Sequence, residues 1–126
     1  MSSSSSFPGA EYSVEFLPET AAEANSLTTD VRREIARIVV ELSKNAHLGE
    51  LMGDRPPKVL RGCRKIRFDR RGWDNKPRYR LVYRNEPSDG APSTVCVLAI
   101  APRDRMVAYA RASSRLVRRI AEEGRS

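Results

Sequence analysis

The chain has 126 residues, of which 40% are hydrophobic and 31% are charged, and its 23 Lys or Arg outnumber 16 Asp or Glu to give a net charge of +7. This composition predicts one globular domain with a real core and excludes a disordered chain, and because no apolar run reaches the ~20 residues of a membrane span we expect a cytoplasmic protein. One histidine and two cysteines outside any CxxC spacing exclude a structural zinc site, and the sequence lacks the glycine-rich motifs of nucleotide-binding loops.

The N-terminal part predicts a tail and then one strand. Residues 1–10 include a run of five serines and are expected to be a disordered tail, which leaves residues 11–126 as a single domain. Hydrophobic and polar residues then alternate in the period-two pattern of a half-buried strand, with the larger side chains at Tyr12, Val14 and Phe16. Pro18 ends this strand.

Two helices are predicted next. Thr20 and Glu23 have the spacing of a capping box for a short first helix. Thr28 or Thr29 can cap a second helix, which has one apolar face and one basic face. The apolar residues of this second helix are Val31, Ile35, Ile38, Val39 and Leu42.

A strand with two projecting cations follows a loop. Residues 49–57 hold two Gly and two Pro, which predicts the loop. Alternation then returns at residues 64–68, where Lys65 and Arg67 share one face of the strand. Arg64 shares the opposite face with the hydrophobic residues.

The remaining pattern predicts two more strands and a closing helix. A long basic connection over residues 69–78 leads to a strand at 79–84, and after a Pro/Gly-rich turn the apolar run at 94–101 is typical of a central strand covered on both faces. Pro102 ends that strand. Asp104 is a candidate cap for a helix that apolar spacing continues through about Ile120.

The basic residues are concentrated in one segment. Between Arg55 and Arg84 there are twelve Lys or Arg and only two Asp, so the rest of the chain carries a net negative charge. Clustered cations neutralise phosphates and supply most non-specific nucleic-acid affinity, which favours a phosphate-rich partner. A solvated charged surface is the alternative interpretation.

The order of elements and a small set of residues resemble the RelE branch of the RelE/ParE toxin superfamily. The resemblance covers about Tyr12 to Leu116 and includes the run Tyr-Arg-Leu-Val-Tyr at 79–83. Its more specific part is Lys65-Ile66-Arg67 combined with Arg103 and Tyr109. The resemblance implies an α+β domain in which a small, mostly antiparallel four-stranded sheet packs with two N-terminal helices and a C-terminal helix.

The resemblance also implies an activity. Toxins of this branch belong to type II toxin-antitoxin systems, bind the ribosomal A site and cut mRNA there as endoribonucleases, with the RNA's own 2′-hydroxyl as nucleophile and without a metal or other cofactor. The implied catalytic residues are Lys65, Arg67, Arg80, Arg103 and Tyr109. Two departures stand out, because the family usually has Lys at the position of Arg67 and a shorter connection than the one around Trp73.

The chemistry of these residue types agrees with that activity. Attack of a 2′-oxygen on the neighbouring phosphate builds negative charge, which fixed cations stabilise. Tyr109 can serve as base or orienting group if neighbouring cations favour its phenolate form. Spacing alone also allows Tyr109 to pack against the sheet, and it allows Arg80 and Arg103 to form structural ion pairs.

Further RNA contacts are predicted outside the catalytic set. They are Arg64, Arg84, Arg105 and Trp73. An exposed Trp73 can stack on a base, while a loop tryptophan can equally fold back onto its own domain.

The implied partners are a cognate antitoxin protein, mRNA and the ribosome, with operator DNA bound only by the toxin-antitoxin complex. Two alternatives remain at this stage. One is a ParE-like inhibitor of DNA gyrase without nuclease activity, which the cations at positions 65 and 67 argue against. The other is a non-toxic relic that still binds an antitoxin.

Overall fold

The computed structural model describes residues 11–53 and 57–124, apart from the side chain of Arg105. The tail expected over residues 1–10 lies outside the described residues. The elements in chain order are β1 (Ser13–Phe16), α1 (Pro18–Asn25), α2 (Thr29–Lys44), β2 (Glu50–Leu51), the 3-10 helix η1 (Lys58–Leu60), β3 (Arg64–Phe68), β4 (Tyr79–Glu86), β5 (Thr94–Pro102), the 3-10 helix η2 (Asp104–Met106) and α3 (Val107–Glu123).

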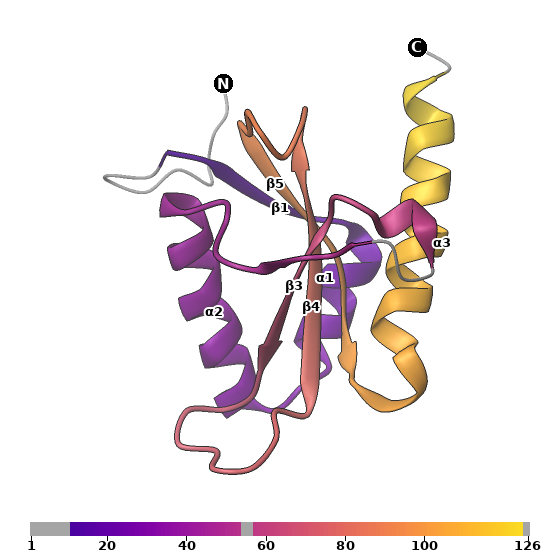
Figure 1. Cartoon of the computed structure of the whole chain (residues 1–126). Helices are drawn as coiled ribbons and strands as arrows, with labels where there is room; N and C mark the ends of the chain where they lie inside the picture. The colour runs from indigo at the N-terminus through magenta and orange to yellow at the C-terminus, as the bar shows by residue number, and fades with distance from the viewer. Residues whose placement is uncertain (1–10, 54–56, 125–126) are drawn as a thin grey trace.

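The strands form one sheet in the order β1-β5-β4-β3-β2. Strand β1 runs parallel to β5, whereas the other neighbouring pairs are antiparallel. Helices α1 and α2 cover one face of the sheet and α3 covers the other (Figure 1). The predicted α+β class with a mostly antiparallel sheet is therefore confirmed.

Two hydrophobic clusters, one on each face, hold these layers together. The first joins α1 and α2 to residues such as Leu81 and Tyr83, and the second joins α3 to residues such as Val82 and Leu98. Residues 95–101 of β5 are at most 1% exposed, which confirms a central strand covered on both sides. Successive side chains of β4 therefore pack into different hydrophobic clusters, on opposite faces of the sheet.

The sheet has five strands, because β2 lies within the segment that the sequence predicted to be a loop. Glu50 and Leu51 pair with Lys65 and Arg64 of β3, and the Met52 N–H donates to the Cys63 carbonyl at 2.8 Å. Two residues are too few to show a period-two pattern, so the neighbouring glycines and prolines dominated the prediction.

The capping-box prediction for α1 is wrong. The helix begins at Pro18, and Leu17 precedes it as the cap residue. Thr20 and Glu23 instead bind β5, because the Thr20 hydroxyl donates to the Leu98 carbonyl at 2.8 Å and Glu23 accepts a 3.1 Å hydrogen bond from the Ile100 N–H.

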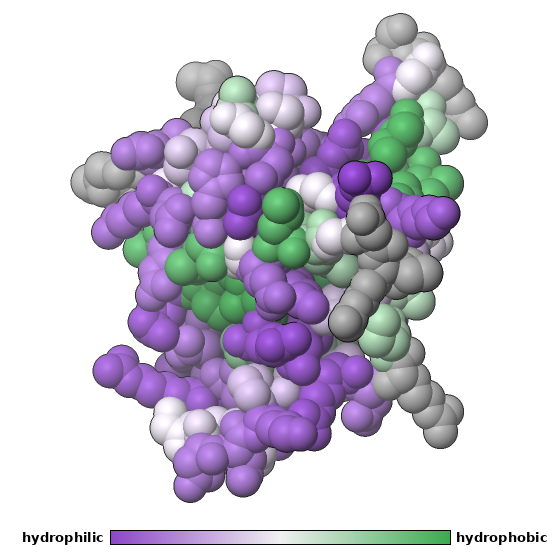
Figure 2. Space-filling view, viewed as in Figure 1, coloured by the Kyte–Doolittle hydropathy of each residue, from purple (hydrophilic) through white to green (hydrophobic). Residues whose placement is uncertain are grey.

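Helix α3 also differs from the prediction at both ends. Asp104 begins the preceding 3-10 turn, and the cap residue of α3 is Met106, which has a φ of 59°. The helix continues to Glu123, beyond the expected end. Two apolar residues in its last turns, Val117 and Ile120, are 55% and 44% exposed, and α3 shows hydrophobic surface at the upper right of Figure 2.

Candidate active site

Most arginines outside the predicted catalytic set hold a carboxylate. Arg111 and Arg115 both bind Glu23, while Arg84 and Arg119 both bind Glu86. Further arginines within 4.0 Å of a carboxylate include Arg33, Arg37, Arg64, Arg78 and Arg118.

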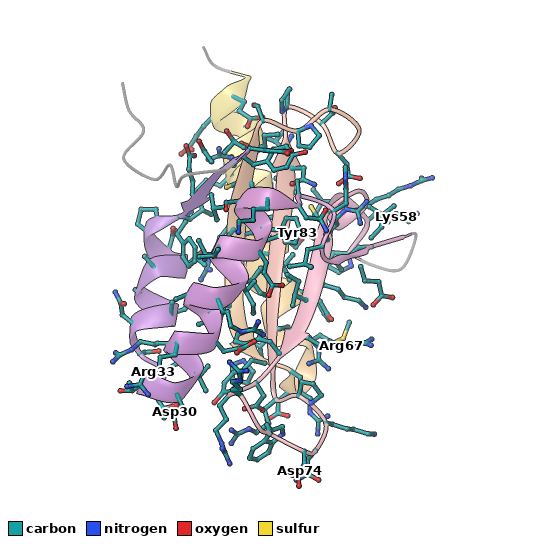
Figure 3. All side chains as sticks on the ribbon, turned by 90° about the vertical axis from the view of Figure 1, so that its left-hand side faces the viewer. Asp30, Arg33, Lys58, Arg67, Asp74 and Tyr83 are labelled. Atoms are coloured by element: carbon teal, nitrogen blue, oxygen red, sulfur yellow. The ribbon has the colours of Figure 1, made fainter. Side chains whose placement is uncertain are left out.

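Strands β3 and β4 bring three of the predicted cations together. Lys65 and Arg67 lie on the same face of β3, as their spacing predicted, and Arg67 is the Cα partner of Arg80 on β4. This face is the one covered by α3, because Val82, the partner of Lys65, belongs to the α3-side core. In Figure 3 the Arg67 side chain points away from α2.

Arg103 lies beside the start of β4. It follows β5 by one residue, and its N–H donates to the carbonyl of Arg78 at 2.8 Å. Two residues earlier on β5, Ala101 is the Cα partner of Arg80. Arg67, Arg80 and Arg103 therefore come from three neighbouring strand ends at one edge of the sheet.

No carboxylate neutralises these cations in the part of the chain that the structure describes. Arg67 and Arg103 are exposed, and neither side chain has a hydrogen bond or ion pair to a described residue. Arg80 donates only to the carbonyls of Pro77 and Tyr79, at 3.1 and 2.9 Å. Like charges opposite each other destabilise a sheet, and a local cost of this kind is expected at functional sites.

Tyr109 lies beside Lys65 but is mostly buried. The Lys65 ammonium is 5.7 Å from the centroid of the Tyr109 ring, a distance at which a cation and an aromatic face attract each other. Tyr109 is 8% exposed and packs in the α3-side core. Its hydroxyl makes no hydrogen bond to a described residue. The Tyr109 ring thus attracts the Lys65 ammonium independently of any role of the Tyr109 hydroxyl.

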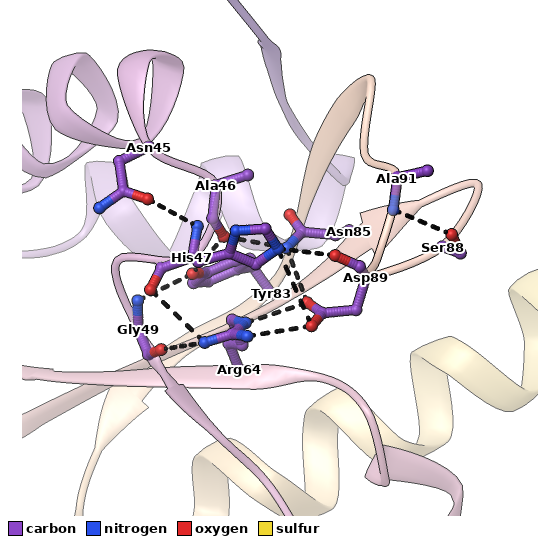
Figure 4. A network of polar contacts seen from close by, with 10 residues as sticks. All are labelled: Asn45, Ala46, His47, Gly49, Arg64, Tyr83, Asn85, Ser88, Asp89 and Ala91. Carbon is purple, nitrogen blue, oxygen red and sulfur yellow. Dashed lines mark hydrogen bonds and ion pairs between the residues drawn. The ribbon is translucent and has the colours of Figure 1, made fainter.

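Arg64 lies on the opposite face of β3 and takes part in the polar network of Figure 4. Its guanidinium binds both carboxylate oxygens of Asp89, at 2.9 and 3.0 Å, and the Gly49 carbonyl at 2.8 Å. The hydrogen bond from Arg64 lowers the pKa of Asp89. Arg64 is therefore engaged in holding β3 and the connection after α2 together, which leaves less of it available to RNA.

Tyr83 and Gly49 complete this network on the face of the sheet opposite the Lys65 side chain. The Tyr83 hydroxyl donates to the Ala46 carbonyl at 2.8 Å and accepts from the Gly49 N–H at 2.9 Å, and burial raises the pKa of Tyr83 to about 12. A Cβ at Gly49 would stand 2.8 Å from the Lys65 carbonyl oxygen. Only glycine allows this close approach.

The other predicted RNA contacts have different surroundings. Arg84 is within 3.3 Å of Glu86 and 3.5 Å of Glu123, so the structure commits it to carboxylates. The side chain of Arg105 lies outside the described residues. Trp73 folds back onto its own loop, because its indole N–H donates to the Lys76 carbonyl at 3.1 Å and the Arg78 guanidinium stacks 3.7 Å from the ring.

Sequence reasoning missed the residue that organises this loop. Asp69 is the only acid at its start, and it accepts hydrogen bonds from the backbone N–H groups of Arg70 and Arg78 and from two guanidinium nitrogens of Arg78. These bonds, led by the one from the Arg78 side chain, lower the pKa of Asp69 to about 2. No sequence periodicity marks a pair nine residues apart across a loop.

The site offers cationic and hydroxyl chemistry. Among the described residues, no three His, Cys, Asp or Glu side chains are grouped so that they could hold a metal ion. Cys63 and Cys96 are buried and unbridged, and burial raises the pKa of each thiol to about 11. No helix in the described ranges is both long and apolar enough to cross a membrane.

The fold is similar to solved structures of RelE from E. coli. No protein-family model matches the sequence, and no curated protein does either. A double arginine-to-alanine mutant of the E. coli toxin RelE in the free state gives a TM-score of 0.60 at 23% identity, over 84% of this chain and 97% of that one. The isolated E. coli RelE toxin gives 0.54 at 24% identity, over 85% and 99%.

A chain of the intact E. coli RelBE toxin-antitoxin complex is also similar. It gives a TM-score of 0.54 at 23% identity and covers 76% of this chain and 100% of that one. The chain therefore has the RelE toxin fold, which confirms the resemblance seen in the sequence at the level of the fold.

Proposed function

We propose that this chain, which has the RelE fold, is the toxin of a type II toxin-antitoxin pair and cuts mRNA on the ribosome. The observation that carries the proposal is the charge pattern of the sheet. Lys65, Arg67, Arg80 and Arg103 have no carboxylate partner among the described residues, although most arginines elsewhere do. Cations kept free of acids at one edge of a sheet suit a phosphate group.

The proposed reaction uses the RNA itself as the nucleophile. The 2′-oxygen attacks the adjacent phosphorus, its proton leaves, and the bond to the 5′-oxygen of the next nucleotide breaks as that oxygen takes up a proton. Negative charge grows on the non-bridging oxygens during this step. We assign the stabilisation of that charge to Arg80 and Arg103, because both come from neighbouring strand ends and neither has a carboxylate partner among the described residues.

Lys65 and Arg67 have different roles in this proposal. A guanidinium keeps its proton, so Arg67 acts as an electrostatic clamp, and the lysine usual at this position in the family is not required for that role. The ammonium of Lys65 can give up and regain a proton, which makes it the group that serves the 2′-oxygen or the leaving oxygen. The ring of Tyr109 orients Lys65 from 5.7 Å.

The proposed protein partner is an antitoxin with an acidic segment that covers these cations. One structure with this fold is that of a RelBE toxin-antitoxin complex. The unpaired cations would gain carboxylate partners in such a complex, and charge complementarity of this kind favours both fast association and correct orientation. The same contacts would block access of a phosphate to the site.

Primer extension on a message under translation tests the proposal. We expect cleavage of mRNA on ribosomes and none of the same RNA when it is naked. Expression in a growing culture should cause growth arrest that a cognate antitoxin reverses. Arrest without cleavage would contradict the nuclease and favour inhibition of another target such as DNA gyrase, while the absence of both effects would point to an inactive relic.

A further inference from the structure

The loop between β3 and β4, residues 69–78, is held in one conformation by its own side chains. Asp69 has only 3% of its side chain exposed, and it binds Arg78 with side-chain hydrogen bonds of 2.8 and 2.9 Å. A further bond of 2.7 Å links Asp69 to the Arg70 N–H, and Gly72 supplies a left-handed turn with a φ of 85°. The two ends of the loop are therefore fastened to each other.

Trp73 strengthens this loop from within. The Arg78 guanidinium covers its ring at 3.7 Å, and the Arg70 guanidinium lies 5.2 Å from the ring centroid. A base cannot stack on the surface that Arg78 already occupies. The indole therefore supports the loop, and the cations around it are the candidates for contacts with a nucleic acid.

Three cations of the loop are exposed and unneutralised. Arg70, Arg71 and Lys76 form no ion pair with a carboxylate in the described ranges. A cleft of about 490 Å³ lies between the loop and α2, where Arg70 and Arg71 face an α2 wall that includes Glu34, Arg37 and Glu41. This end of the molecule is largely hydrophilic in Figure 2.

The loop adjoins the proposed active site. It begins two residues after Arg67 and ends two residues before Arg80, the two cations that face each other across β3 and β4. The loop tip, marked by Asp74, and Arg67 lie at the same end of the sheet in Figure 3. Arg67 also borders the cleft that Arg70 and Arg71 line, so RNA whose scissile phosphate sits at Arg67 and Arg80 would pass the loop at this end of the sheet.

We propose that the β3–β4 loop is an RNA-binding arm in which Arg70, Arg71 and Lys76 contact phosphates next to the scissile one. This inference rests on the proposed function and adds the substrate contacts to it. A loop that is already rigid loses little conformational freedom on binding, so its cations yield more affinity than the same charges on a mobile segment. The extended loop would therefore increase the length of RNA that the protein holds.

The test compares two variants of equal charge. One replaces Arg70, Arg71 and Lys76 with Gln, and the control replaces Arg32, Lys44 and Arg118, which are exposed on α2 and α3, with Gln. The affinity of each full-length protein for a short single-stranded RNA is measured across a range of salt concentrations by fluorescence anisotropy. Each phosphate contact contributes about 0.7 to the slope of log affinity against log salt.

We expect the loop variant to lose about 2 from this slope, the value for three contacts, and the control to lose much less than one contact's share. Equal slopes in the two variants would overturn the proposal, as would a wild-type protein that does not bind the RNA. Wild-type RNA binding by the loop variant, together with loss of its affinity for an acidic polypeptide, would assign the loop to a protein partner instead.

This measurement needs no cleavage. A failure of the proposed nuclease function appears as intact mRNA on ribosomes, whereas a failure of the loop inference appears in the salt slopes. The two outcomes can therefore be told apart. Circular dichroism of both variants should match that of the wild type, because the six replaced side chains are exposed.

Discussion

Arginines have different surroundings in two regions of the molecule. Those on α3 bind carboxylates, whereas several at the end of the sheet near the β3–β4 loop bind none among the described residues. Around α3, Arg115 and Arg119 each form paired hydrogen bonds with a carboxylate, on Glu23 and Glu86 respectively. At the sheet edge, Arg67 and Arg103 have no such partner among the described residues. A count of basic residues therefore does not separate the arginines that bind carboxylates from those that do not, whereas the structure does.

Glu23 shows what a paired cation achieves. Burial raises the pKa of Glu23, but hydrogen bonds from Arg115 and from the Ile100 N–H lower it more, so the net shift is downward. The carboxylate joins α1 to β5 and α3 in this way. At the sheet edge, Arg67 and Arg103 join no elements through a carboxylate of the described residues, so their charges are available for a ligand.

The largest expected effect is on activity at the unpaired edge. Replacing Lys65 with Gln should lower the single-turnover rate of mRNA cleavage on ribosomes by about 10² to 10³, the usual cost of one charge-stabilising donor. Thermal unfolding should change little, because Lys65 has no ion pair to lose. Tyr109→Phe keeps the ring that supports Lys65, so a loss in that variant would assign a role to the hydroxyl. A Lys65→Gln protein that cleaves at the wild-type rate would contradict the role proposed for the unpaired cations.

The next largest effect is on stability at the paired region. Glu23→Ala removes the carboxylate that accepts from Arg115 and from the Ile100 N–H, and it should lower the free energy of unfolding by about 3 kcal/mol. Urea denaturation measures this change. Glu19→Ala is the matched control, because it removes an exposed pair with Arg118 on the same two helices and should cost far less. Equal losses in both variants would show that the buried position of Glu23 is unimportant.

A smaller effect concerns pH and the loop clamp. The pKa of Asp69 is about 2 in the folded protein and close to 3.9 in an unfolded chain. The carboxylate therefore contributes about 2 kcal/mol of stability that is complete above pH ~4 and is lost as the pH falls through about 2. Between these pH values the stability of the wild type should fall more steeply than that of Asp69→Asn, and parallel curves from acid titrations would contradict the clamp.

The smallest expected effect concerns Met106, the residue that links the end of the sheet to α3. Met106 has a φ of 59° and precedes α3, which carries both Tyr109 and the paired arginines. Glycine adopts this conformation without steric cost, so Met106→Gly should stabilise the protein by about 1 kcal/mol or less. Differential scanning calorimetry should show a slightly raised Tm with cleavage unchanged. A lowered Tm would mean that contacts of the Met106 side chain outweigh the strain.

Local patterns predicted the secondary structure well and tertiary contacts poorly. The period-two alternation of β3 placed Lys65 and Arg67 on one face correctly, because side-chain direction in a strand depends only on neighbouring residues. The spacing of Thr20 and Glu23 fitted a capping box, yet both side chains bind β5 instead. A short polar motif can serve a local or a distant partner, and the sequence does not distinguish them.

The division between paired and unpaired cations was also hidden in the sequence. Arg64 finds Asp89 twenty-five residues away, and Arg84 contacts Glu123 thirty-nine residues away. Such partners meet only because of the fold, so a linear count treated Arg64, Arg84 and Arg67 alike. The Tyr109 ring lies beside Lys65, but the burial of Tyr109 depends on how α3 packs, which the sequence does not show.

One measurement compares an unpaired arginine with a paired one in the same protein. It determines both the ribosomal mRNA cleavage rate and the free energy of unfolding for Arg103→Gln and Arg115→Gln, an unpaired and a paired arginine. The account predicts that Arg103→Gln loses about 10² to 10³ in cleavage rate with stability unchanged, and that Arg115→Gln loses stability while its folded fraction cleaves normally. Normal cleavage by Arg103→Gln, or a loss of stability equal to that of Arg115→Gln, would contradict it.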